Sequence, residues 1–230
     1  MKKLKILLLF VFILLSCEIL AKNLDATYIN MKEKVTIIQS KCSKCTDLIN
    51  FSCAKNKIHC CFKIDQYVRN NSKLFWENQE FFDFVQKVDF NNTNILKSIL
   101  KIHGWPTISK FGKRTDQEAW LLVQHADHDL EFQASIAFIL EQLSMIGETD
   151  LKNFAYLYDR VANNFNMIGI KQKYGTQAII ENKTIKLAPF VGDIRELDER
   201  RKMMRLIPIK EYLNQLGKFY KLKVIVENNS

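Results

Sequence analysis

Residues 130–145 carry the stretch LEFQASIAFILEQLSM, which predicts a long helix. Apolar side chains recur in it at helical spacing, and Gly147 follows where such a helix ends. The run Ala119–Val123 predicts a second apolar helix, which Thr115 and Glu118 would begin as a capping box. These two helices place the core of a helical domain in the middle of the chain.

Further helices flank this centre. Residues 92–103 have an amphipathic pattern that Gly104 and Pro106 terminate. On the other side, either Thr149 or Asp150 caps the helix that follows residue 147.

The pattern changes toward the C-terminus. After Tyr174 the apolar residues recur with a period of two, and residues 178–187 predict a β-hairpin. Two short helices, Glu196–Met204 and Ile209–Leu216, and a strand, Leu222–Val226, complete the chain. We therefore expect a mainly α (α+β) fold, with a helical core and a small C-terminal β-hairpin.

The composition fits one compact domain with an appendage. The chain has 230 residues, of which 47% are apolar, but only seven Gly and three Pro, which argues against a turn-rich all-β fold. Its net charge of +9 at pH 7 is spread along the chain. Because basic and aromatic residues do not alternate and no basic block occurs, we expect no nucleic-acid partner.

The first 21 residues predict an export signal. Lysines precede an apolar run, residues 6–15, which is shorter than the roughly 20 residues that span a bilayer. Residues 14–17, LLSC, have the form of a lipobox that would lipidate Cys17, and the alternative is cleavage after Ala21. We expect a periplasmic, lipid-anchored or secreted protein, with no transmembrane helix in its mature part and a lipid anchor as its one link to a membrane.

The other cysteines are crowded into one short segment of the chain. In an exported protein such crowding predicts disulfides that hold a small N-terminal appendage, residues 22–63. An odd number leaves one thiol free, paired between chains or blocked. A zinc site is the alternative, but it needs a second pair as well spaced as the C-x2-C pair. The five cysteines are Cys42, Cys45, Cys53, Cys60 and Cys61.

A thiol-disulfide protein is a further alternative. Val35–Ile38 has the composition of a strand, Cys42–Cys45 is a C-x2-C motif, and Pro106-Thr107 comes later, in an order similar to the thioredoxin family. That resemblance would make Cys42 the reactive thiolate. Against it, the 60 residues between Cys45 and Pro106 exceed the usual separation in that fold.

The densest polar cluster is residues 124–129, QHADHD. If the preceding helix continues through it, His125, His128 and Asp129 share one face and could hold a divalent metal, the one cofactor that the sequence suggests. Without metal, His125 could act as a general base that Asp127 orients, with His128 as a further catalytic candidate. The structural alternative is that Asp127 or Asp129 caps the next helix while the histidines pack and form hydrogen bonds.

A series of motifs runs through the middle of the chain: Val88-Asp89, Gly104-Trp105-Pro106, residues 119–129, Phe132-Gln133, residues 155–160, residues 174–177, Arg200-Arg201 and Tyr212-Leu213. Over about residues 85–216, these motifs resemble one family of bacterial domains of unknown function. That family has no established activity, so the resemblance implies a sequence pattern without a mechanism. Leu130 stands where the family often has proline, and a proline there would mark the start of a helix just after Asp129. The resemblance therefore implies that Asp129 is an N-cap. It leaves the cysteine cluster outside the family pattern.

Polar residues from other elements could converge on the same pocket. Two of them are arginines that could bind an anion through both guanidinium nitrogens. The ligand-binding candidates are Gln124, Asp159, Arg160, Tyr174, Gln177, Arg200 and Arg201.

The sequence thus predicts a helical domain, residues 64–218, followed by a strand and tail, residues 219–230. A pocket centred on His125 and Asp127 favours hydrolase-type chemistry. The alternative is binding of a small polar or anionic ligand, or of a surface, without turnover.

Overall fold

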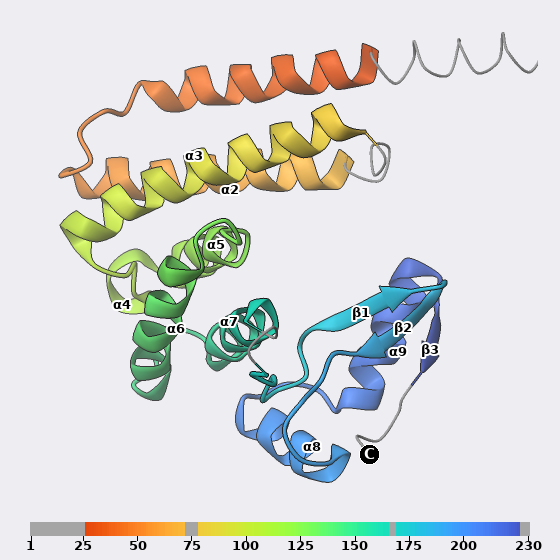
Figure 1. Cartoon of the computed structure of the whole chain (residues 1–230). Coiled ribbons are helices and arrows are strands. Elements are labelled where there is room, and N and C mark those ends of the chain that lie inside the picture. The colour runs from red at the N-terminus through yellow and green to blue at the C-terminus, as the bar shows by residue number, and fades with distance from the viewer. Residues whose placement is uncertain (1–25, 72–77, 166–168, 226–230) are drawn as a thin grey trace, which may run out of the picture. The chain divides into compact units, whose positions relative to one another are not determined.

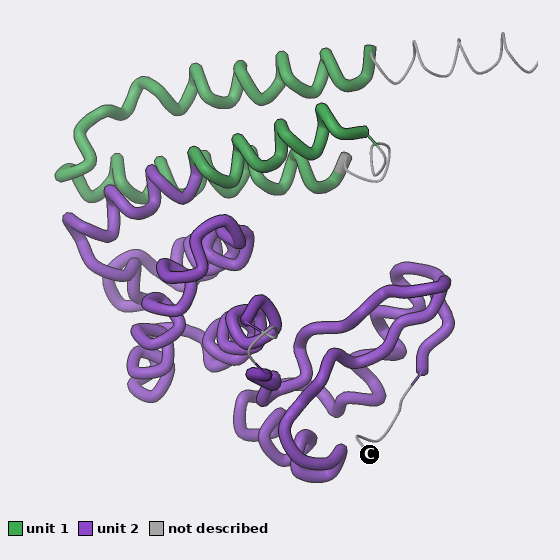
Figure 2. The backbone as a smooth tube through the Cα atoms, viewed as in Figure 1, with its two compact units in different colours: residues 1–91 green, residues 92–230 purple. Residues whose placement is uncertain are grey.

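The computed structural model describes residues 26–71, 78–165 and 169–225. The predicted export signal, with Cys17, lies outside these residues. Contacts divide the chain into two compact units, residues 1–91 and 92–230 (Figure 2). Helix α3 (Gln79–His103) runs across the boundary between them.

All regular secondary structure in the described part of the first unit is helical. They are a helix at residues 26–43, α2 (Phe51–Asn71) and the beginning of α3 (Figure 1). The strand predicted at Val35–Ile38 is wrong, because Val35 shares a helix face with residues 28 and 31 and packs inward with them. The buried core consists of Tyr28, Met31, Val35, Ile64, Val68, Phe81 and Val88.

Two disulfides join the end of the first helix and the turn after it to α2. Cys42 pairs with Cys60, and Cys45 pairs with Cys53. Cys61 is buried and is the one cysteine of the described residues that lies outside the two disulfides. The predicted disulfides, and one thiol left over, are confirmed, and the C-x2-C cysteines are bonded to α2 rather than to each other.

The second unit begins with a group of helices that follows the last part of α3. The long helix predicted at residues 130–145 is confirmed with the same bounds. The helices are α4 (Ile108–Phe111), α5 (Lys113–Gln124), α6 (Leu130–Met145) and α7 (Leu151–Asn164).

Capping side chains set the starts of two helices in this group, α6 and α7. The Asp129 side chain accepts the N–H of Phe132 at 3.1 Å and caps α6, and Asp150 caps α7 in the same way. The capping box predicted at Thr115 and Glu118 is wrong. Helix α5 begins after Gly112, and both residues are buried inside it.

The sheet lies near the C-terminus and packs on two helices. Strands β1 (Ala178–Glu181) and β2 (Thr184–Leu187) form the predicted antiparallel hairpin, and β3 (Lys223–Ile225) pairs parallel to β2. Both central residues of the hairpin turn, Asn182 and Lys183, have positive φ, as a type I′ turn requires.

Helix α9 (Ile209–Tyr220) packs against β2 and β3, and α8 (Ile194–Met203) packs against α9. The core that they share with the sheet consists of Ile185, Phe190, Leu197, Ile209 and Leu213. Strand β3 approaches α9 so closely that a Cβ on Gly217 would clash with the side chain of Val224. The mainly helical fold with a small C-terminal sheet is thus confirmed. Within the three described ranges, no helix has the length and apolarity needed to cross a membrane.

Candidate functional site

The polar cluster at residues 124–129 forms a turn between two helices. Helix α5 ends at Gln124, His125 is its C-cap residue, and Asp129 is the N-cap of α6. A continuous helix through His125, His128 and Asp129 is therefore wrong, and with it the metal geometry that depended on it. The described residues include no group of three or more His, Cys, Asp or Glu side chains placed to hold a metal ion.

The two histidines of this turn lie outside the apolar core. His125 is half-buried and His128 is exposed. Asp129 forms an ion pair with Lys97 of α3. The hydrogen bond from Lys97 lowers the pKa of Asp129, and its cap bond from Phe132 acts in the same direction.

Asp127 is the centre of a hydrogen-bond network. Its carboxylate forms a two-point ion pair with Arg160 of α7, in which Nε and Oδ1 are 2.9 Å apart. The same Oδ1 accepts the side-chain amides of Gln133 at 3.1 Å and Asn164 at 3.0 Å. Arg160 also reaches the side-chain oxygen of Gln177 at 3.4 Å. The structure thus brings three predicted site residues together, Asp127, Arg160 and Gln177.

This network keeps Asp127 ionised. Burial acts to raise its pKa, but the hydrogen bond and charge of Arg160 outweigh burial, and the amides of Gln133 and Asn164 add to them, so that the pKa is lowered. A carboxylate of lowered pKa is a weak proton acceptor near neutrality. Asp127 is therefore better suited to fixing positions than to accepting a proton.

Asp159 has a different role from its neighbour Arg160. Its buried carboxylate accepts the backbone N–H groups of Lys173, Tyr174 and Thr176 at 2.8–3.2 Å and the hydroxyl of Thr176 at 3.0 Å. Burial raises the pKa of Asp159, and these hydrogen bonds oppose the rise. Asp159 thus shapes the segment that leads into β1.

The two arginines of α8 hold the same segment from the other side. Arg201 is buried and donates to the carbonyl oxygens of Tyr174 at 2.6 Å and Ile207 at 2.7 Å, with its guanidinium 4.9 Å from the ring centre of Tyr212. Arg200 donates to the carbonyl oxygen of Lys173 at 2.8 Å. Both predicted anion-binding arginines therefore bond backbone carbonyl groups.

The side chains of the remaining candidates, Gln124 and Tyr174, also make contacts within the domain. With its amide oriented to satisfy its neighbours, Gln124 accepts the backbone N–H of Leu157 at 2.8 Å. The Tyr174 ring packs edge-to-face on Phe154 and Tyr158, and burial raises the pKa of its hydroxyl to about 12.

A cavity of about 250 Å³ opens between the first turns of α5 and α7. These helices run side by side in the same direction, since Asp116 and Asn153 meet at their starts while Asp127 and Arg160 meet at their ends. The residues around the cavity are Lys113, Asp116, Gln117, Trp120, Asp150, Lys152, Asn153 and Tyr156.

A buried carboxylate, Asp116, lies among the residues that line this cavity. It accepts the indole N–H of Trp105 at 2.8 Å and the amide of Asn153 at 3.0 Å. Burial raises its pKa, which the bonds from Trp105 and Thr149 oppose. None of the lining residues was predicted as a site residue. One feature of the sequence could have pointed to this site. Trp105 in the Gly-Trp-Pro motif has an indole N–H that needs a hydrogen-bond acceptor when the ring is buried.

A family model described as "Family of unknown function (DUF6624)" matches residues 55–225. The match extends beyond the predicted range of about 85–216 at both ends. It takes in Cys60 and Cys61, so the expectation that the whole cysteine cluster lies outside the family pattern is wrong. No curated protein and no solved structure matches the chain.

Proposed function

Since the chain belongs to the DUF6624 family, whose description assigns no activity, we propose from the cavity between α5 and α7 that it binds a small anionic ligand without converting it. One observation carries this proposal: aromatic walls and lysine side chains surround a single hollow of molecular size. The ligand would be a carboxylate or phosphate attached to an apolar, preferably planar, body.

The aromatic walls favour a planar ligand. The rings of Trp120 and Tyr156 meet edge-to-face with their centres 6.0 Å apart, and both side chains are partly exposed. Rings in this arrangement offer an apolar surface against which another ring can pack.

The charges around the cavity favour a negative group. Lys113 and Lys152 lie in the first turns of α5 and α7, where the partial positive charge of each helix N-terminus adds to their own. The two carboxylates of the lining already have donors. Asp116 accepts Trp105 and Asn153, and Asp150 caps α7 through the N–H of Lys152. Asp150 also forms a long ion pair with Lys113, at 3.8 Å, but the Lys113 side chain stays 71% exposed and can turn to an anion.

Benzoate and its neutral counterpart benzamide test this proposal, with the fluorescence of the tryptophans as the signal. Benzoate should bind and benzamide should bind at least about tenfold more weakly, because only benzoate carries the charge that the lysines attract. The pair Lys113→Gln and Lys152→Gln should weaken benzoate binding, whereas Lys110→Gln on α4, outside the lining, is the matched control. Equal binding of the two probes, or equal effects of all three substitutions, would contradict the proposal.

Hydrolysis at the 124–129 turn is a second candidate. It is favoured by the partial exposure of His125 and of the Asp127 carboxylate, which leaves both within reach of a substrate. With p-nitrophenyl acetate as the probe, His125→Ala should abolish turnover and leave the melting temperature unchanged. A fall of several degrees in the melting temperature, without any effect on turnover, would identify His125 as a packing residue.

A further inference from the structure

The disulfide-closed turn between residues 43 and 51 gathers positive charge. Between residues 34 and 64 the chain has six lysines and a single carboxylate, that of Asp47. The Asp47 carboxylate accepts the N–H of Ile49 at 3.0 Å, within its own turn. The lysines of this segment thus face little opposing charge from their own stretch of chain.

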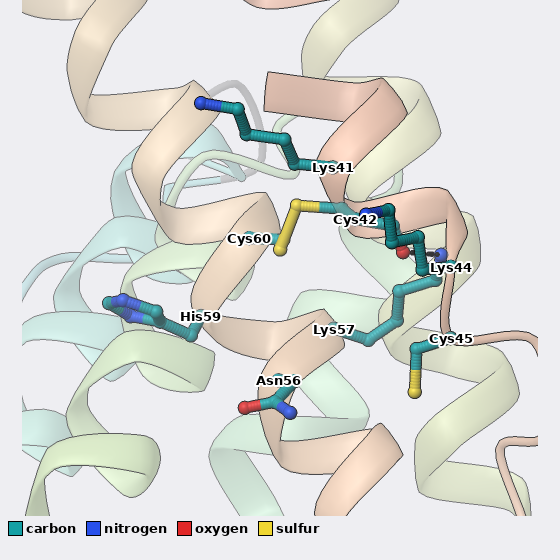
Figure 3. Close-up of a pocket in the computed structure, with 8 residues that line it drawn as sticks. All are labelled: Lys41, Cys42, Lys44, Cys45, Asn56, Lys57, His59 and Cys60. Atoms are coloured by element: carbon teal, nitrogen blue, oxygen red, sulfur yellow. Dashed lines mark hydrogen bonds between the residues drawn. A yellow bond between two sulfur atoms is a disulfide. The ribbon is translucent and has the colours of Figure 1, made fainter. Parts of the chain in front are cut away.

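Three of these lysines surround a hollow beside the disulfide between Cys42 and Cys60. The cavity measures about 290 Å³, and its lining includes Lys41, Lys44 and Lys57 but, among the described residues, no carboxylate (Figure 3). Lys57 donates to the carbonyl oxygen of Cys42 at 2.8 Å, which ties α2 to the end of the first helix. The disulfide and this bond hold the two segments that carry the lysines together, so little order must be gained when an anion binds.

The same turn exposes apolar side chains. Ile49 is 76% exposed and Phe51 is 43% exposed, and both lie in the loop that the Cys45–Cys53 disulfide closes. A peripheral membrane-binding surface has two components, basic residues and apolar residues. This turn has both, because large apolar side chains lie in a short closed loop next to a group of lysines. Lysines attract anionic headgroups, and apolar side chains enter the boundary between headgroups and acyl chains.

We propose that this turn, residues 41–60, docks on an anionic lipid surface. Lipid phosphate groups lie between Lys41, Lys44 and Lys57, while Ile49 and Phe51 insert at the depth of the headgroups. A soluble phosphate would use the same lysines but would give the exposed Ile49 and Phe51 no role, and this favours the lipid.

Co-sedimentation of the full chain with vesicles tests the proposal. Two kinds of vesicle are compared, phosphatidylcholine alone and phosphatidylcholine with anionic phosphatidylglycerol. A lipid anchor on Cys17 would bind the chain equally to both kinds, whereas charge attraction favours the anionic one. The chain should favour the phosphatidylglycerol vesicles. Changing Lys41 and Lys44 to Gln should lower this partitioning by about fivefold for each lysine, and added salt should weaken what remains.

A matched pair, Lys202→Gln and Lys210→Gln, removes two exposed lysines from the second unit and should leave partitioning unchanged. Ile49→Asn should lower partitioning at high salt as well, since insertion does not depend on charge. Equal sedimentation with both vesicle types, or equal loss in both lysine pairs, would overturn the proposal. So would binding of inorganic phosphate that requires Lys41 and Lys44 in a chain that does not sediment with vesicles.

Discussion

Asp127 and Arg160 join the turn after α5 to the last turns of α7 through a two-point ion pair, with Nε and Oδ1 at 2.9 Å. The residue that the sequence suggests as a catalytic carboxylate is therefore an ionised acceptor that connects two helices. Its side chain is 43% exposed and that of Arg160 is 33% exposed, so solvent weakens the pair.

A double-mutant cycle measures this pair. Asp127→Asn and Arg160→Gln should show a coupling energy of about 1 kcal/mol in the free energy of unfolding, above that of an exposed pair because the contact has two points. The pair of Glu181 and Lys186 in the hairpin, with a single contact at 3.1 Å, is the control and should couple by only a few tenths of a kcal/mol. Equal coupling in both cycles would show that the second contact adds nothing.

Acid should weaken the second unit. The pKa values of Asp127 and Asp129 are lowered in the folded chain, so their contributions are complete above the ordinary carboxyl pKa of about 4 and are lost as the pH falls through the lowered values. Urea unfolding at a series of pH values measures this loss. The double substitution Asp127→Asn with Asp129→Asn should reduce the decline below about pH 4, and an unchanged decline would contradict the assignment.

Removing the Asp159 carboxylate should be costly. Asp159→Ala leaves the N–H groups of Lys173, Tyr174 and Thr176 without their acceptor inside the domain. The free energy of unfolding should fall by about 3 kcal/mol or more, against about 1 kcal/mol for Asp193→Ala, which removes an exposed helix cap. Similar losses for both substitutions would mean that the segment finds other hydrogen-bond partners.

Cys61 should be unreactive in the folded chain. Burial raises the pKa of its thiol to about 12, and a buried thiol in its neutral form reacts slowly. Iodoacetamide should therefore label none of the cysteines from Cys42 to Cys61 in the native protein and Cys61 alone after denaturation without reductant. Label on Cys42 or Cys45 would contradict the disulfides.

The predicted export signal can be tested by the intact mass of the protein. After expression in a bacterium, the protein should lack residues 1–16 or residues 1–21, because the short apolar run behind the lysines matches a cleaved signal. Diacylglycerol on Cys17 would identify the first cleavage. Recovery of a soluble chain that retains Met1 would contradict export.

The sequence predicts best those elements whose ends are set by residues nearby in the chain. Helix α6 has its predicted bounds because Asp129 and Gly147 act within one turn of its ends. The start of α5 was misplaced, because Thr115 and Glu118 have the spacing of a capping box but are buried by packing and lie within the helix. Packing also overrode β propensity at Val35.

The sequence by itself determined the mainly helical fold, the hairpin, the crowding of the cysteines and the family pattern, since each rests on spacing along the chain. Only the tertiary structure decided which cysteines pair and what the polar residues contact. Asp127 meets Arg160 and Asn164, Asp159 meets the segment before β1, and the cavity lies at the starts of α5 and α7. These contacts join residues that are 14 to 37 positions apart, and their meeting depends on how the helices pack, which no local pattern specifies.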